Sequence, residues 1–509
     1  MTFSLAAQPQ VVSLRRIFPS ASFVGCGDLR ITAAADHSRH CRPGSLFAVV
    51  HGLQSDGLEH LPEAIQNGAS SLLVDRPLCD VSLPQCVVPD VRRAFAELCA
   101  AMYGYPSRQL GLVGVTGTNG KTTTTWLMRS ILQAAGKQAG LLGTIEYSDG
   151  IDIRPASLTT PGSAQLSQWL GSMVRRGTTH AAIELSSHAL DQRRCAGTLL
   201  DAAVITNITQ DHFDYHGTWE HYRQSKMRIL DYIKPAGLAI VNMDDPGSRS
   251  ALDEAPRRLM TYGLSQPADV SGLILDSSLS GSHFRVVVGS QHAVMKTRLP
   301  GQHNVGNCLA AIAAATHLGI NLDQIARGIE SLQSVPGRLD PVDCDQPFHV
   351  FVDYAHTDDA LQRCLTFLKS LTTGRLIVVF GAGGNRDRSK RKLMGQAAQL
   401  ADLAVVTSDN PRTEDPQQII RDILTGFGAG PQPLVEPDRE LAIAMALQRA
   451  RRGDCVLIAG KGHETEQIIG DRKIPFDDRE VARRCLGQGS PLQEPHLFRR
   501  WARASRTKL

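Results

Sequence analysis

Short runs of apolar residues alternate along the chain with longer stretches of helical pattern. In the middle of the chain the apolar runs occupy residues 111–115, 181–185, 202–206 and 238–242. A second series occupies residues 350–352, 376–380, 404–407 and 456–459. Runs of this length and composition predict buried strands, and their alternation with helices favours a largely parallel sheet covered by helices. The pattern therefore predicts an α/β fold.

Two segments rich in glycine and proline divide the chain. The first is YGYPSRQ at residues 103–109, and the second is VPGRLDPVD at residues 335–343. Such punctuation is typical of boundaries between domains. Upstream of the first, apolar runs occupy residues 46–50, 71–74 and 85–88, and no catalytic cluster accompanies them. We predict three domains, at residues 1–108, 109–339 and 340–509.

Polar or glycine-rich clusters follow nearly every apolar run. Their sequences are GTNGKT, ELSSH, TNITQDH, DYAH, GAGGNRD, SDNPR and AGKGHE. In open parallel sheets, ligands bind beyond the carboxyl ends of the strands. Two successive α/β domains with chemical groups at these ends suggest a site shared by facing domains.

The segment GTNGKT, at residues 117–122, follows one predicted strand and opens a predicted helix over residues 122–135. Glycines let backbone N–H groups surround phosphate oxygens, and a helix N-terminus adds partial positive charge. Lys121 would reach the terminal phosphates and Thr122 would bind Mg²⁺. The generic pattern has glycine where Val115 stands, so this is a variant phosphate loop. The alternative, an ordinary turn, would not need lysine and threonine here.

Two further positions are candidates for binding a metal. Glu184 closes an apolar run, so it is either a ligand for a hard cation beside the phosphate loop or a capping or surface residue. His212 and His216 stand four residues apart, but no third zinc ligand lies at a convincing spacing, and the phosphate loop favours Mg²⁺. His212 alone is either a metal ligand or a structural histidine.

Composition narrows the class of protein. The 54 basic and 50 acidic residues are too balanced to suggest a nucleic-acid-binding protein. The 11 cysteines are scattered, which is typical of reduced cytosolic thiols rather than disulfides or structural zinc. We find no membrane span and no secretory signal, so we expect a cytoplasmic protein.

Several of these motifs together resemble one family, the Mur ligases, which are ATP-dependent amide ligases of peptidoglycan synthesis. GVTGTNGKTTT, ELSSH and TNITQDHFDYHG resemble its central signatures. VPGR, DYAH and the pair Asn304 and Asn307 resemble its ATP elements, and DNPRTEDP and AGKGHE resemble its C-terminal ones. The resemblance covers nearly the whole chain. It implies an N-terminal domain that binds a UDP-sugar, a central parallel-sheet domain with the ATP phosphate loop, and a C-terminal Rossmann-like domain that binds an amino acid.

The resemblance also implies specific binding residues. For ATP they are Gly117, Thr118, Asn119, Gly120, Lys121, Thr122, Thr123, Asn307, Arg338 and Asp353. For UDP-N-acetylmuramoyl-L-alanyl-D-glutamate they are Ser38, Thr159, Thr160, Ser186, Gln192 and Arg194. For meso-diaminopimelate they are Arg391, Asp409, Asn410, Pro411, Arg412, Gly460 and Glu464.

Catalysis is implied at Lys121, Glu184, His212 and Lys226, with Mg²⁺ held by Thr122, Glu184, His212 and Lys226. Lys226 matches a lysine that family members convert with CO₂ to a carbamate, which would turn a cation that repels Mg²⁺ into an acid that holds it. The alternative is a surface lysine. The sequence departs from the family pattern at His37, Leu158, His303, Asp340 and Asp358.

The implied reaction is ATP-driven amide formation on the D-Glu side-chain carboxylate through an acyl phosphate, with diaminopimelate as the attacking amine. We expect ATP and the two other small molecules as partners, no nucleic acid, no membrane span, and a monomer. Three alternatives remain: a related ligase that adds L-lysine or another residue, a ligase like folylpolyglutamate synthase, and a nucleotide-dependent switch. GAGGNRD is a weaker candidate for a dinucleotide fingerprint, because it lacks the third glycine.

Overall fold

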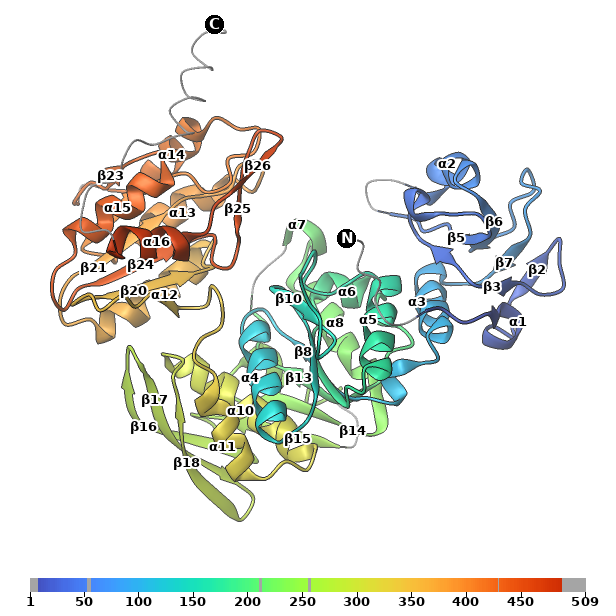
Figure 1. The fold of residues 1–509 in the computed structure, drawn as a ribbon, viewed down its shortest axis with the longest axis horizontal. Helices are drawn as coiled ribbons and strands as arrows, with labels where there is room; N and C mark the ends of the chain where they lie inside the picture. Colours follow the sequence, from blue (N-terminus) through green and yellow to red (C-terminus); the bar gives the residue numbers. More distant parts are fainter. Residues whose placement is uncertain (1–7, 53–55, 210–212, 255–257, 429, 488–509) are drawn as a thin grey trace, which may run out of the picture. The chain divides into compact units, whose positions relative to one another are not determined.

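The computed structural model describes residues 8–52, 56–209, 213–254, 258–428 and 430–487. The chain forms two compact units (Figure 1). The first comprises Met1–Leu275, His283–Thr297 and Gln302–Leu332, and the second comprises Asp276–Ser282, Arg298–Gly301 and Gln333–Leu509. Strands and helices alternate in both, which confirms the predicted α/β class. The predicted boundaries after residues 108 and 339 stay predictions.

The N-terminal part of the first unit contains a five-stranded sheet. Its strand order is β2 (Ser22–Val24), β7 (Gln85–Val87), β6 (Ala69–Val74), β5 (Ser45–Ala48) and β4 (Ala34–Ala35). Helix α3 (Val91–Met102) packs on this sheet and buries Phe95 and Leu98 in its core. The three upstream apolar runs therefore form β5, β6 and β7, within a few residues of the predicted bounds.

The rest of the first unit is built on an eleven-stranded sheet. Its parallel strands, in order, are β9 (Ala139–Leu142), β12 (His180–Glu184), β8 (Gly111–Thr116), β13 (Leu200–Ile205), β14 (Ile233–Asn242), β15 (Leu259–Gly263) and β16 (Val270–Ser278). Strands β10 (Glu146–Ser148) and β11 (Ile153–Pro155) extend one edge antiparallel. Strands β17 (Gly281–Val288) and β18 (Gln291–Thr297) complete the other edge.

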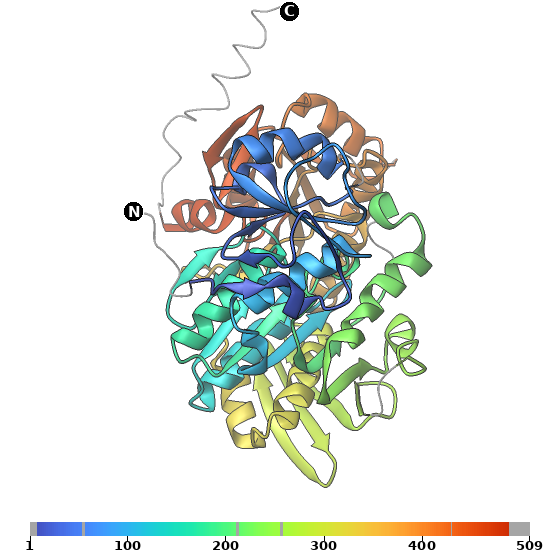
Figure 2. The same ribbon diagram turned by 90° about the vertical axis from the view of Figure 1, so that its right-hand side faces the viewer.

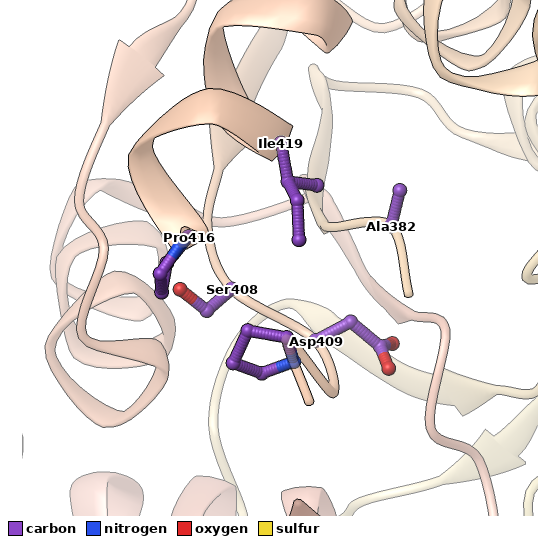
Figure 3. Close-up of a pocket in the computed structure, with 6 residues that line it drawn as sticks. Ala382, Ser408, Asp409, Pro416 and Ile419 are labelled. Carbon is purple, nitrogen blue, oxygen red and sulfur yellow. The ribbon is translucent and has the colours of Figure 1, made fainter. Parts of the chain in front are cut away.

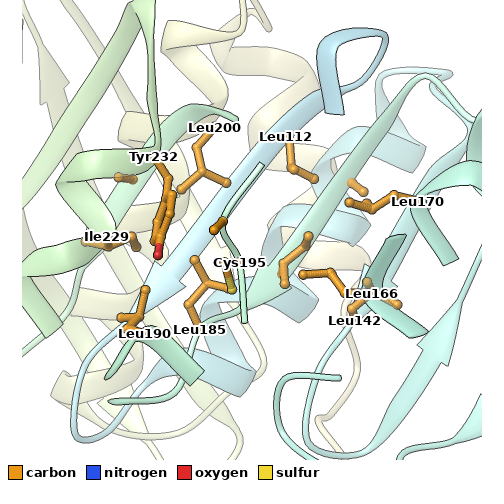
Figure 4. Close-up of a cluster of buried hydrophobic side chains, with 14 of the residues drawn as sticks. Leu112, Leu142, Leu166, Leu170, Leu185, Leu190, Cys195, Leu200, Ile229 and Tyr232 are labelled. Atoms are coloured by element: carbon orange, nitrogen blue, oxygen red, sulfur yellow. The ribbon is translucent and has the colours of Figure 1, made fainter. Parts of the chain in front are cut away.

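Helices cover both faces of this sheet, which is why its central strands contain continuous apolar runs rather than an alternating pattern. On one face α4 (Lys121–Ala134), α10 (Gln302–His317) and α11 (Leu322–Ser331) pack together, and α11 also contacts β18 (Figure 2). On the other face α5 (Ser163–Arg175) and α6 (Ser187–Asp191) close a core that includes Leu112, Leu170 and Leu200 (Figure 4). Each of these three leucines is at most 1% exposed.

The second unit has a six-stranded sheet of Rossmann-like type. Its order is β19 (Asp340–Pro341), β20 (His349–Asp353), β24 (Cys455–Ala459), β21 (Leu376–Phe380), β22 (Leu403–Val406) and β23 (Leu434–Val435). All neighbours are parallel except β19 with β20. Alternate residues of β21 enter two separate cores, Val378 on one face and Ile377 on the other, so helices cover both faces.

The helices of this unit are α12 (Asp358–Leu371), α13 (Ser389–Ala398), α14 (Pro416–Leu424), α15 (Arg439–Arg449) and α16 (Asp478–Gly487). A hairpin of β25 (Glu466–Ile469) and β26 (Arg472–Pro475) follows β24. Among the described residues of the whole chain, no helix combines the length and apolar character needed to cross a bilayer.

Candidate functional site

The phosphate loop connects β8 to α4, as predicted. Gly120 precedes the helix at φ +86°, and a side chain on it would meet the amide oxygen of Asn307 from α10. Gly117 lies at φ +150°, and a side chain there would meet the hydroxyl of Thr206. Only glycine fits both positions. The loop therefore passes tightly between α10 and the residues that follow β13, and it ends at the N-terminus of α4, where an anion would be favoured.

Side chains from the segment after β13 and from α8 (Trp219–Met227) hold the loop in shape. The N–H of Asn119 donates to Asn207 Oδ1 at 2.8 Å, and Thr206 Oγ1 donates to the carbonyl of Asn119 at 2.6 Å. Thr118 Oγ1 lies 3.0 Å from the hydroxyl of Tyr222. Lys121 Nζ donates to the loop carbonyls of residues 117 and 118, at 2.7 and 2.9 Å. The lysine thus lies at the loop where a phosphate would bind.

Glu184, at the end of β12, is fully buried and surrounded by hydroxyl and amide donors. Its Oε2 accepts from Thr122 Oγ1 at 3.0 Å and from Thr144 Oγ1 at 2.9 Å, and its Oε1 accepts from the N–H of Thr144 at 2.8 Å. It is therefore neither an exposed surface residue nor a helix cap. Thr144 is a residue that sequence analysis missed, because nothing but its place after a short apolar run marks it.

Lys226, on α8, is 1% exposed, so it is not a surface lysine. Its Nζ donates to the carbonyl of Gly117 at 2.8 Å and lies 4.5 Å from the ring centre of Tyr222. His212 lies outside the described residues. His216 is buried against the rings of Tyr215 and Tyr222. Within the described part of the chain, no group of three or more His, Cys, Asp or Glu residues is placed so that it could hold a metal ion.

Five of the six residues predicted for the UDP-sugar substrate form one cluster beside Glu184. Thr160 Oγ1 donates to the carbonyl of Glu184 at 2.8 Å and accepts from the N–H of Ser186 at 3.0 Å. Arg194 donates to the carbonyl of Thr160 at 3.2 Å and, through Nη2, to Gln192 Oε1 at 2.7 Å. Thr159, the fifth, lies 3.2 Å from Thr144.

The sixth residue, Ser38, belongs to the N-terminal part of the unit. It is 2% exposed and donates to Glu63 Oε2 at 2.6 Å. Its hydroxyl proton is therefore already used within the protein.

The three residues predicted to bind ATP outside the phosphate loop lie in two units. Asn307 is on α10 beside Gly120, and its amide donates to Asn304 Oδ1 at 3.1 Å. Arg338 and Asp353 belong to the second unit. Asp353 accepts from two backbone N–H groups at 2.7 and 2.8 Å, and burial raises the pKa of its carboxyl. The Arg338 guanidinium lies 5.0 Å from the ring centre of Tyr354.

In the second unit, the loops after β22 and β24 contain most residues predicted to bind the amino acid. Asn410 Nδ2 donates to Glu464 Oε2 at 2.8 Å. Lys461 is fully buried, and its Nζ donates to Asn410 Oδ1 at 3.2 Å and Glu464 Oε2 at 3.0 Å. A side chain on Gly460 would meet the carboxylate of Asp409. Asp409 and Pro411 also line a small pocket with Ala382, Ser408, Pro416 and Ile419 (Figure 3).

Two arginines of this region differ sharply in their partners. Arg391 is 1% exposed and forms ion pairs with Glu414 at 3.0 Å and Asp422 at 2.9 Å. Arg412 donates through Nη1 to the carbonyl of Gly384 at 2.7 Å and has no carboxylate partner among the described residues. Arg391 thus joins α13 to α14, whereas Arg412 forms no ion pair with the described residues.

Two buried cations of this unit were not predicted from the sequence. One is Lys461, described above. The other is Arg439, which donates to both oxygens of Asp478 at 2.7 Å and to the carbonyl of Ala459 at 2.9 Å, directly before Gly460. Arg439 is buried against Asp478, 39 residues away in the sequence. Lys461 is enclosed by Asn410, 51 residues away, as well as by the nearby Glu464. Their burial is therefore not evident from the local sequence.

Comparison with known proteins agrees with these motifs. The family model "Mur ligase middle domain" matches residues 115–315, and "Mur ligase, glutamate ligase domain" matches residues 337–462. The chain is 45% identical to UDP-N-acetylmuramoyl-L-alanyl-D-glutamate–2,6-diaminopimelate ligase of Geobacillus thermodenitrificans, over 90% of this chain and 96% of the relative. It is 40% identical to UDP-N-acetylmuramyl-tripeptide synthetase of Roseiflexus sp., over 89% and 93%.

Solved structures show the same relationship. A UDP-N-acetylmuramoyl-L-alanyl-D-glutamate–2,6-diaminopimelate ligase structure is 33% identical, with a TM-score of 0.68 over 94% of this chain and 99% of the other. Escherichia coli FolC in complex with ADP, at 21% identity and a TM-score of 0.56 over 73% of this chain and 90% of that one, shares the fold alone. The two family models and the relatives, aligned over nine-tenths of the sequence, lead to one conclusion: the chain belongs to the Mur ligase family.

Proposed function

We propose that this Mur ligase uses ATP to join meso-diaminopimelate to the D-Glu side-chain carboxylate of UDP-N-acetylmuramoyl-L-alanyl-D-glutamate, a step of peptidoglycan precursor synthesis. The observation that carries the proposal is the 45% identity, over nine-tenths of both chains, to a relative named for this ligation. The amino-acid site adds support, since the loops after β22 and β24 provide both acidic and basic groups for a zwitterionic substrate.

The phosphate loop would act on the first half of the reaction. The substrate carboxylate attacks the γ-phosphorus of ATP, the bond to ADP breaks, and an acyl phosphate forms. Lys121 would neutralise charge on the transferred group from the N-terminus of α4, where the backbone N–H groups also point. No protein nucleophile is needed, so positioning and electrostatics supply the catalysis.

Side-chain oxygen atoms beside the phosphate loop are suitable ligands for Mg²⁺. Thr122 and Glu184 supply oxygen ligands, which this ion prefers, and one carboxylate with substrate phosphates is a common Mg²⁺ site. The bound ion would spread the negative charge of the phosphates. His212 is proposed as a further ligand from family resemblance alone.

We also propose that Lys226 carries a carbamate. The side chain of Lys226 is buried beside the phosphate loop, where an unmodified ammonium would repel Mg²⁺ and a carbamate would attract it. A carbamate places a carboxylate-like group at the end of a long side chain, next to the phosphate loop that Lys226 already contacts.

The second half of the reaction would use the second unit. Acidic groups at Asp409 and Glu464 suit the ammonium groups of diaminopimelate, and Arg412 suits the carboxylate at its far end. The free amine attacks the acyl carbon, inorganic phosphate leaves, and the amine loses its proton to give the amide. The protein would act as a monomer in the cytoplasm, on ATP and the two other small molecules.

A ligase for L-lysine is the second candidate, because lysine shares everything with diaminopimelate except the distal carboxylate. Arg412, with no carboxylate partner among the described residues, favours diaminopimelate. The proposal is tested by incubating the pure chain with ATP and each combination of the two other substrates. Phosphate release and the tripeptide mass should require both the UDP-linked dipeptide and diaminopimelate. Phosphate release without the dipeptide, or equal product with lysine, would contradict it.

A further inference from the structure

Thr144 stands between the carboxylate of Glu184 and the hydroxyl of Thr159. Strands β9 and β12 are parallel neighbours with Leu142 opposite Ile183, so the residues that follow β9 lie beside the end of β12. Gly143 allows a close approach, because a side chain there would meet Glu184 Oε1. The backbone N–H of Thr144 then binds Oε1 at 2.8 Å.

The hydroxyl of Thr144 has two acceptors within reach. Its Oγ1 lies 2.9 Å from Glu184 Oε2 and 3.2 Å from Thr159 Oγ1. A hydroxyl has a single proton, so it donates to one of them at a time. An ionised carboxylate is the stronger acceptor, so the proton is directed to Glu184 as long as its full negative charge is available.

We propose that Thr144 is a positioning residue whose shared proton couples cation binding at Glu184 to substrate recognition at Thr159. A cation on the carboxylate makes it a poorer acceptor, which releases the Thr144 proton toward Thr159. A hydroxyl that accepts a hydrogen bond becomes a stronger donor, so Thr159 then donates more strongly to an oxygen of its ligand. The inference rests on the proposed function, which assigns Mg²⁺ to Glu184 and the UDP-linked dipeptide to Thr159.

Such coupling must be reciprocal, so Mg²⁺ should tighten substrate binding. The test is calorimetric titration of the full chain with UDP-N-acetylmuramoyl-L-alanyl-D-glutamate, in the presence of a saturating non-hydrolysable ATP analogue, in saturating Mg²⁺ and in EDTA. The ratio of the two dissociation constants is compared between wild type, Thr144→Val and Thr144→Ser. Mg²⁺ also binds the diphosphate of the ligand itself, but that contribution is the same for every variant.

We expect the Mg²⁺-dependent ratio to be about fivefold smaller in Thr144→Val than in wild type, at the lower end of typical couplings. Thr144→Ser keeps the proton and should keep the ratio. Thr159→Val removes the second acceptor for the Thr144 proton. The Mg²⁺-dependent ratio should therefore fall in Thr159→Val as it does in Thr144→Val. An unchanged ratio in Thr144→Val, with substrate still bound, overturns the inference alone. Failure of the wild type to bind the dipeptide overturns the proposed function and the inference with it.

Discussion

Replacing Arg412 should change which amino acid the enzyme accepts. Nη1 of Arg412 is used by the carbonyl of Gly384, so the other edge of the guanidinium, Nε and Nη2, is available for a carboxylate. Two parallel charge-assisted hydrogen bonds can form along that edge. Each contributes about 1.5–3 kcal/mol. Because Arg412 is partly exposed, we take the lower end of the sum, about 3 kcal/mol.

For Arg412→Ala this predicts a loss in kcat/KM for meso-diaminopimelate on the order of 10²-fold, since 1.4 kcal/mol corresponds to about a factor of ten. Lysine has no distal carboxylate, so its kcat/KM should stay the same or rise. The wild type should prefer diaminopimelate by about 10⁴-fold, as sites built for a polar group do. The variant should retain a preference of about 10²-fold.

The assay is phosphate release at varied concentrations of each amino acid, with ATP and the UDP-linked dipeptide saturating. Arg421→Ala is the matched control: Arg421 is exposed, lies nearby and pairs only with Asp415 at 3.4 Å among acidic groups of the described chain, so the change should have little effect. Equal losses toward both amino acids in Arg412→Ala would refute the reasoning. They would mean that Arg412, at φ +52°, serves to hold the loop against β25.

Four further changes have defined outcomes. Lys121→Ala should raise the activation barrier by about 3–4 kcal/mol and so lower turnover, while the circular dichroism spectrum stays that of the wild type. Turnover within tenfold of wild type would contradict the role of Lys121 at the phosphates. Lys226→Ala should be inactive and partly restored by a small carboxylic acid in the buffer, whereas rescue by a small amine would indicate a cationic lysine. Burial lowers the pKa of His463 to about 4, below the usual value near 6.5, so the unfolded state alone binds this proton between those pH values. The unfolding free energy of wild type, measured in urea, should therefore fall as the pH drops from 6.5 to 4 by about 3 kcal/mol more than that of His463→Gln, and equal slopes would refute the shift. Lys461→Met should leave the carboxylate of Glu464 without its cation and lower the free energy of unfolding by about 3 kcal/mol. The same change should raise the KM for diaminopimelate, and an unchanged KM would place Lys461 outside the amino-acid site.

The strands and the phosphate loop could be predicted from the sequence because their signals are local. Continuous apolar runs marked β8 and β21, and glycines next to Lys121 marked the turn into α4. The edge of the large sheet formed by β10 and β11 was missed, since each of these strands is three residues long and follows no clear alternation. The predicted ends of strands differ from the observed ends by a few residues where polar residues extend a strand. Strand β14, for example, begins at Ile233 rather than at residue 238.

Residues of the site could be predicted only where they lie within sequence motifs of the family. Ser186 follows β12 closely, but Thr160 lies in the loop before α5 and Arg194 follows α6, so their contacts depend on how the chain folds around the end of β12. The contact of Thr144 with Glu184 depends on the order of β9 and β12 in that sheet, which no local pattern encodes.

Charged residues were the hardest to interpret. A sequence shows that Arg391 is a cation but not that Glu414 and Asp422 already neutralise it inside the protein. The assignment of Arg391 to the amino-acid substrate stays a prediction. The same holds for Lys461, whose burial becomes visible only when Asn410 and Glu464 are placed around it.

The acyl phosphate is the central claim, and the fate of one oxygen atom tests it most directly. The UDP-linked dipeptide is labelled with ¹⁸O in the D-Glu side-chain carboxylate and converted with ATP and meso-diaminopimelate, and the released phosphate is analysed by mass spectrometry. If the carboxylate attacks phosphorus and the amine then displaces phosphate, each phosphate carries one labelled oxygen. Phosphate without label, formed alongside the amide, would contradict the account.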